Sequence, residues 1–234
     1  MSPLAAAGPS VSWYLTRSSG VVSLLLLTAA TALGVLDVRR TSSERWPRFV
    51  IDALHRNVAL LAICFLGLHI LTTVLDSFTS IGLAEAFVPF ISSYRPFWLG
   101  LGALAFDLLL AISITSMMRQ RLGYGTWRAI HWLSYACWPI ALVHGLGTGS
   151  DTTAGWMLLL DGLCVGVVLI ATIARALTIW GAHPERGRLA IGGAGLFTLF
   201  LVLWLPSGPL GHEWARRSGT PTALLPKHSA KGND

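Results

Sequence analysis

Six long apolar stretches limit what this chain can fold into. Each is close to the 20 residues that an α-helix needs to cross a hydrocarbon core about 30 Å thick. Lipid offers no water to unpaired backbone groups, so such stretches span a membrane as helices. A mean hydropathy of +0.63, with only 12% charged residues, excludes an ordinary soluble domain. The expected spans are residues 15–36, 51–75, 97–118, 127–147, 155–179 and 188–206.

The basic residues indicate how these helices are oriented. They crowd the first, third and fifth connections, whereas Arg95 is the only one in the second and fourth. By the positive-inside rule the odd-numbered connections are cytoplasmic and both termini lie outside. Arg216, Arg217, Lys227 and Lys231 run against this orientation, because they follow the last helix. The net charge of +6 therefore reflects membrane topology and no nucleic-acid site. The crowded connections hold Arg39, Arg40, Arg45, Arg48, Arg56, Arg119, Arg121, Arg128, Arg175, Arg186 and Arg188.

These features predict an all-α, multi-pass protein of the cell membrane, built as one six-transmembrane-helix bundle over residues 15–206. Residues 1–14 and 207–234 are expected to be mobile, solvated tails. The first apolar stretch differs from a signal peptide, because its strongest positive cluster follows the apolar run and does not precede it. We therefore expect this stretch to be retained as a helix.

Four histidines lie inside two of the expected helices, as two pairs. His55 and His69 occupy positions i and i+14 of the second helix, and His131 and His144 occupy positions i and i+13 of the fourth. At 1.5 Å per residue the members of each pair lie about 20 Å apart along the axis. Both helices run outward, so His55 faces His131 near the cytoplasm (the inner pair) and His69 faces His144 near the exterior (the outer pair). Histidines inside a membrane are costly and usually have partners, so this pattern predicts two bis-histidine haem sites between these helices.

Two b-type haems are the expected cofactors. No Cys-x-x-Cys-His stretch occurs, so thioether-linked haem is not expected. Two imidazoles leave no open position on an iron, which suits electron transfer and disfavours oxygen binding. Haem propionates need cationic partners, for which guanidinium groups are well suited. The candidates are Arg17 outside, with Arg95 second, and Arg56 and Arg128 inside, although membrane anchoring explains the last two equally well.

The i, i+13 separation leaves a problem of phase in the fourth helix. On an ideal helix the i+14 position returns within about 40° of the starting face, whereas the i+13 position misses it by about 140°. Pro139 lies between His131 and His144 and removes a backbone hydrogen bond, so a kink or unwinding there could re-aim one ring. Haems bound at different angles are the alternative.

The histidine pattern resembles the ferric reductase-like transmembrane domain, which is shared by ferric reductases, NADPH oxidases and the membrane subunit of bacterial methionine sulfoxide reductase systems. The resemblance covers roughly residues 15–180. It rests on the two histidine pairs, on the single helix between them, and on the sequence RSSG at Arg17–Gly20. The resemblance implies an oxidoreductase membrane component that passes electrons from a cytoplasmic donor through two haems b to an external acceptor.

Ferric reductases and NADPH oxidases continue into a cytoplasmic domain that binds a flavin and a nicotinamide, whereas this chain stops at Asp234, shortly after its last expected helix. We therefore expect the donor to be a separate flavoprotein or a quinol. The expected acceptor is ferric iron, oxygen or a partner reductase. The sequence GLGTGS at residues 145–150 is no dinucleotide loop, because it follows a membrane helix without a βαβ unit.

Two other interpretations stay open. One is a quinol-oxidising cytochrome b subunit, which has a similar four-histidine arrangement. The other is a non-redox transporter or scaffold whose histidines bind zinc or iron directly. Transporter sites usually add carboxylates, and Asp107 is the only central one. Asp107 and Asp161 are intramembrane carboxylates suited to a proton path, to a hydrogen bond with a ligand histidine, or to pairing with Ser, Thr or Arg.

Overall fold

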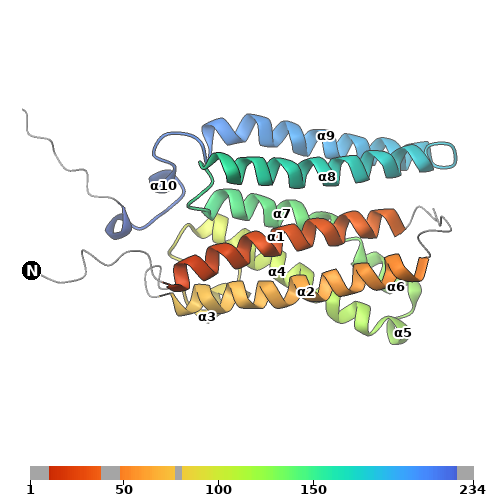
Figure 1. Ribbon diagram of the computed structural model, residues 1–234, viewed down its shortest axis with the longest axis horizontal. Helices are drawn as coiled ribbons and strands as arrows, with labels where there is room; N and C mark the ends of the chain where they lie inside the picture. Colours follow the sequence, from red (N-terminus) through yellow and green to blue (C-terminus); the bar gives the residue numbers. More distant parts are fainter. Residues whose placement is uncertain (1–10, 38–47, 77–80, 226–234) are drawn as a thin grey trace, which may run out of the picture.

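The computed structural model describes residues 11–37, 48–76 and 81–225, and these ranges contain helices and no strand (Figure 1). The all-α prediction is therefore confirmed for this part of the chain. The helices are α1 (Val11–Asp37), α2 (Arg48–Leu75), α3 (Leu83–Phe87), α4 (Pro96–Met117), α5 (Arg119–Leu122), α6 (Tyr124–His131), α7 (Ser134–Thr148), α8 (Gly155–Ile179), α9 (Pro184–Ser207), α10 (Trp214–Arg217) and the 3₁₀ turn η2 (Thr222–Leu224).

Five of the described helices are long and apolar enough to cross a membrane, namely α1, α2, α4, α8 and α9. They coincide with five of the six spans that the sequence predicts. Only 6% to 28% of the residues in each span are buried inside the protein. Most of the surface of each helix is therefore available to lipid, as expected for a bundle whose solvent is as apolar as its side chains.

The prediction of a single helix over residues 127–147 is wrong. The chain turns at Trp132 and Leu133, which separates α6 from α7, a helix of only 15 residues. Backbone hydrogen bonds here join residues three apart, as in a 3₁₀ turn, and not four apart as in an α-helix. The Leu133 N–H donates to the Ile130 carbonyl at 2.9 Å, and the Tyr135 N–H donates to the Trp132 carbonyl at 3.1 Å. Pro139 lies within α7 and does not interrupt it.

The long helices pack as three neighbouring pairs. α1 lies along α2, α4 along α7, and α8 along α9, while α1 also contacts α7 and α8. Figure 1 shows α8 and α9 together on one side of α1, with α2 on its other side. The largest buried cluster joins α1, α7, α8 and α9 around Trp138 and Leu142. The Trp138 indole Nε1 donates to the Thr28 hydroxyl at 2.9 Å, which ties α7 to α1.

Residues 207–225, which the sequence placed in a solvated tail, pack against the bundle. The Trp214 indole Nε1 donates to the Gly147 carbonyl at 3.1 Å. Arg95 is buried and donates 2.9 Å hydrogen bonds to the same carbonyl and to the Thr220 hydroxyl. Arg95, the second candidate for an outer propionate partner, thus holds the C-terminal segment onto the end of α7. Outside the described residues lie the candidate topology residues Arg39, Arg40, Arg45, Lys227 and Lys231.

Candidate haem-binding site

The outer pair is held by backbone carbonyls on two neighbouring helices. The His69 Nδ1 lies 2.8 Å from the Thr16 carbonyl oxygen in α1, and the His144 Nδ1 lies 2.8 Å from the Trp98 carbonyl oxygen in α4. A carbonyl oxygen only accepts, so each Nδ1 carries the proton and donates it. Each Nε2 is then the nitrogen with the free lone pair, the form that binds metal.

The inner pair is held differently. The His55 Nδ1 donates to the Ala30 carbonyl oxygen in α1 at 3.0 Å. The His131 ring lies 6.3 Å from the His55 ring between centroids, with the planes at 73°. The Nδ1 of His131 is buried and has no hydrogen-bond partner among the described residues. Its ring instead stacks on Trp127, at 5.1 Å between centroids and 28° between planes.

A glycine accompanies each of the three hydrogen bonds. In an α-helix the carbonyl of one residue bonds the N–H four residues later, so the residue at that position lies beside the oxygen. The pairs of acceptor and glycine are Thr16 and Gly20, Ala30 and Gly34, and Trp98 and Gly102. A Cβ at the first two glycines would lie 3.0 and 3.2 Å from the Cε1 atoms of His69 and His55. A Cβ at the third would overlap the His144 ring, so all three imidazoles approach bare backbone.

These contacts fit haem ligation by imidazole. Metal-binding histidines commonly donate their other ring N–H to a carbonyl, which fixes the tautomer and makes the binding nitrogen more basic. Metal–imidazole bonds of about 2.0 Å place two rings on opposite sides of one metal with centroids roughly 6 Å apart. The inner pair, at 6.3 Å, has this spacing.

Neither histidine pair has a third metal-binding side chain beside it in the described part of the chain. No three His, Cys, Asp or Glu side chains gather within the described residues in a way that could hold a metal ion. A metal bound by one histidine pair would need further ligands from outside the chain, and a porphyrin supplies four nitrogens. The direct metal-binding interpretation therefore lacks its protein ligands in this part of the chain.

The turn after His131 makes the problem of phase smaller. A 3₁₀ turn advances about 120° per residue and an α-helix about 100°. Each tightened residue between His131 and His144 thus adds roughly 20°, which brings the i, i+13 separation closer to whole turns. The tightened turn therefore brings His131 and His144 closer to one face of the helical path, and the His131 ring lies beside the His55 ring.

The three predicted propionate partners differ in their surroundings. Arg17 forms an ion pair with Asp151, and its guanidinium lies 3.9 Å from the centroid of the Trp13 ring. Arg17 directly follows Thr16, whose carbonyl oxygen accepts the hydrogen bond from His69. Arg56 is exposed next to His55. Arg128 is exposed and lines a cavity at the inner end of the bundle.

Within the described structure, the two intramembrane carboxylates have no hydrogen bond to the four candidate histidines. Asp107 is half-buried on α4, and Asp161 is buried on α8. Asp161 lines an otherwise largely apolar cavity of about 190 Å³ between α7, α8 and α9. Three of the four histidines therefore donate their Nδ1–H to a backbone carbonyl oxygen and not to a carboxylate, which was one of the roles suggested by the sequence.

Sequence reasoning found the four histidines but missed the glycines at Gly34 and Gly102. It included Gly20 only as part of the RSSG resemblance. A signal was available, because Gly34 follows Gly20 at the same i, i+14 separation at which His69 follows His55. α1 and α2 run antiparallel and make the same glycine–histidine contact at two levels. The two glycines must therefore be as far apart along α1 as the two histidines are along α2.

The part of the chain that matches a known protein family includes the candidate site. The family model for the ferric reductase like transmembrane component matches residues 18–144, more than half of the chain. The chain belongs to this ferric reductase-like family. The matched range includes all four histidines and the three glycines that they approach. Membership of the ferric reductase-like family supports an integral membrane protein with a role in transmembrane electron transfer.

One curated relative is longer than this chain. The alpha-(1->6)-mannopyranosyltransferase A of Mycobacterium tuberculosis is 25% identical over 186 residues, which are 72% of this chain and 34% of that protein. The chain therefore spans about a third of the length of the curated relative that it matches. That relative is named for a sugar-transfer activity. No solved structure matches the chain.

Proposed function

We propose that this ferric reductase-like protein carries electrons across the membrane through two b-type haems. His55 and His131 would hold one haem, and His69 and His144 the other. The contacts that support this proposal are the three imidazole N–H groups that donate to helix carbonyls beside glycines. Haem iron, when bound, supplies a centre that gains and loses one electron.

The histidines perform two tasks in this proposal. The Nδ1–H bonds of His55, His69 and His144 fix these three rings and leave each Nε2 free, so that ordering them would cost little when a haem binds. A haem iron held by two imidazoles would have no open position for oxygen, so the four histidines would suit a haem to electron transfer. Each site is then suited to relaying electrons. The two levels of histidines along α2 divide the membrane crossing into two transfers.

We further propose that electrons enter at the inner pair and leave at the outer pair. The supporting observation is the concentration of arginines at the inner end, which the positive-inside rule assigns to the cytoplasm. The donor would be a separate flavoprotein or a quinol, because the described residues contain no strand and hence no βαβ unit for a nicotinamide. The acceptor would be ferric iron, oxygen or a partner reductase.

Vesicles that contain the purified protein test this function. A reductant is enclosed inside, and ferricyanide, which does not cross the bilayer, is added outside. We expect bis-imidazole haem absorption bands that become reduced from inside and oxidised by the external ferricyanide. The variant His144→Ala should keep the inner haem spectrum but lose most of the transfer rate. Wild-type protein without haem bands, or with haem that ferricyanide cannot oxidise, contradicts the proposal.

A quinol-oxidising cytochrome b is the second candidate, and the cavity at Asp161 favours it. A buried carboxylate in an otherwise largely apolar cavity could hydrogen-bond a quinol headgroup. Haem reduction by a short-chain quinol should then slow strongly in Asp161→Asn but not in Asp107→Asn. Equal rates in the two variants would exclude a quinol site at Asp161.

A further inference from the structure

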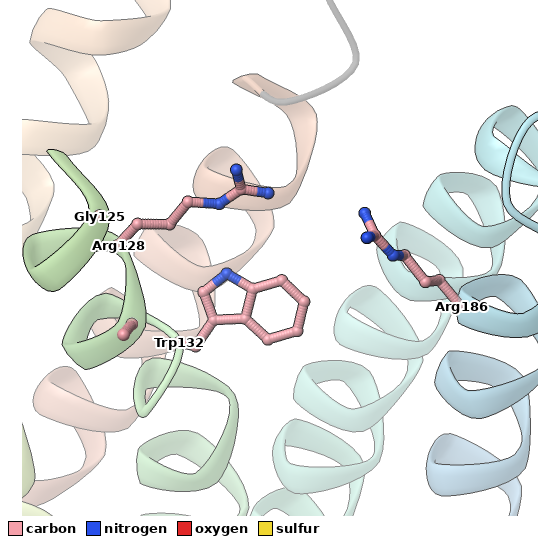
Figure 2. A pocket seen from close by; sticks show the side chains of 5 residues that line it. Gly125, Arg128, Trp132 and Arg186 are labelled. Atoms are coloured by element: carbon pink, nitrogen blue, oxygen red, sulfur yellow. The ribbon is translucent and has the colours of Figure 1, made fainter.

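A second cavity lies at the inner end of the bundle and is separate from the histidine contacts. Its volume is about 390 Å³, and its lining residues are Gly125, Arg128, Ala129, Trp132 and Arg186. Figure 2 shows that the guanidinium groups of Arg128 and Arg186 extend toward each other from opposite sides, with the Trp132 indole below them. Arg128 belongs to α6 and Arg186 to α9, so the bundle itself brings these two cations together.

The two guanidinium groups lack a strong anionic partner among the described residues. No carboxylate in this part of the chain is within ion-pair distance of Arg128. Arg186 has one contact, 4.0 Å from its Nε to the exposed Glu185 of its own helix. Two like charges that face one cavity repel each other unless an anion lies between them. Guanidinium groups bind phosphate through parallel hydrogen bonds, so the cavity has the chemistry of a phosphate site.

The surroundings of the cavity favour the phosphate of a lipid over a soluble phosphate. The Trp132 side chain is 56% exposed, and exposed tryptophans favour the interface between membrane and water. Exposed leucines lie beside the segments of both arginines, with Leu133 directly after Trp132 in the turn that follows α6 and Leu189 almost one turn after Arg186 on α9. They offer apolar surface for acyl chains beside the cationic cavity. Basic pockets between membrane helices on the cytoplasmic side are known sites for anionic headgroups.

We propose that Arg128, Trp132 and Arg186 form a binding site for the phosphate headgroup of an anionic phospholipid. Arg128 and Arg186 bind the phosphate oxygens, and Trp132 packs beside the headgroup at the membrane surface. A lipid bound here joins α6 to α9 and steadies the helix that carries His131. Arg56 then remains as the propionate candidate beside the inner pair. The proposal stands on the cavity alone and does not require a bound haem.

Native mass spectrometry of the purified full chain tests this site. Wild type, R128Q/R186Q and R119Q/R121Q are each titrated with phosphatidylglycerol and with phosphatidylcholine. The control removes two exposed arginines of α5 from the same end of the bundle, so both double variants lose the same charge. We expect wild type and control to prefer phosphatidylglycerol. The occupancy in R128Q/R186Q should fall about tenfold or more, because charge-assisted hydrogen bonds are lost.

A lysine double variant and a soluble headgroup are also tested. R128K/R186K retains the charge but loses the fork geometry, so its retention should lie between wild type and R128Q/R186Q. This variant also serves if the glutamine variant does not fold. Soluble glycerol 3-phosphate is added as the headgroup without acyl chains and should not bind measurably. Equal phosphatidylglycerol retention in the two glutamine variants overturns the site. Binding of glycerol 3-phosphate as tightly as lipid overturns the assignment to a lipid.

Discussion

The inner and outer histidine pairs lie in the same bundle but are supported to different degrees. Both outer rings donate to helix carbonyls, whereas in the inner pair only His55 does so and the buried Nδ1 of His131 is unpaired in the described structure. His144 lies inside an intact helix, whereas His131 is the last residue of α6. Backbone contacts thus orient both outer histidines but only one of the inner histidines.

The helices around each pair explain this difference. At the outer end, the Trp98 ring packs 5.0 Å from the rings of both Trp204 and Trp214, which holds the carbonyl that His144 uses. At the inner end, Trp127 is anchored by one hydrogen bond, 3.2 Å from its Nε1 to the Ser116 hydroxyl. The outer site is therefore built into the helix packing, while the His131 ring, in the described part of the chain, is held by ring contacts with Trp127 and His55.

The largest effect of a single methyl group is expected at the outer site. Gly102→Ala would place a Cβ on the His144 ring and displace it, at a cost of roughly 1–3 kcal/mol for an overpacked site. We expect outer haem binding to weaken by about 10- to 100-fold. Absorption titration of apoprotein with haem measures this, with the inner haem as internal reference.

Gly145→Ala is the matched control for this variant. It adds the same methyl group beside His144, but nothing lies within 4 Å of the new Cβ. Because alanine favours a helix over glycine by up to about 1 kcal/mol, this variant should bind haem normally and be slightly more stable. Similar haem loss in Gly102→Ala and Gly145→Ala would show that the ring contact with Gly102 has no importance.

Smaller effects are expected at the two glycines of α1, and each should affect a different haem. A Cβ at Gly20 lies 3.0 Å from His69, and a Cβ at Gly34 lies 3.2 Å from His55. These contacts are tight and not overlapping, so a small shift relieves them and haem binding should weaken only a few-fold, below about 1 kcal/mol. Gly20→Ala should weaken the outer haem and Gly34→Ala the inner one. A common effect on both haems would refute the separate contacts, with Gly67→Ala as the unhindered control.

The smallest effect tests the aromatic support of the inner site. Trp127→Leu removes the ring that stacks on His131, a contact worth about 0.5–1.5 kcal/mol. Inner haem affinity should fall a few-fold to about tenfold while the outer haem is unchanged. Trp180→Leu, which removes an exposed tryptophan at the inner end that does not stack on His131, should leave both affinities unchanged. Loss of the outer haem in Trp127→Leu would contradict the division into two independently supported sites.

Features that depend on local sequence could be predicted, and those that depend on contacts between helices could not. Hydropathy located five spans, and spacing identified the histidine pairs, because both are properties of single helices. The break at Trp132 and Leu133 has no such signal, since the apolar run continues through it without proline or glycine. Pro139 does not mark this break, because α7 continues past it. The role of Gly102 requires knowing that α4 lies against α7.

Counting low-spin, bis-imidazole haems in two double variants tests the pairing of the histidines most directly. Wild type should contain two such haems per chain. H55A/H131A removes both ligands of the inner haem and should retain one, whereas H55A/H144A takes one ligand from each haem and should retain none. One bis-imidazole haem in H55A/H144A, or none in H55A/H131A, would contradict the two pairs described for this ferric reductase-like protein.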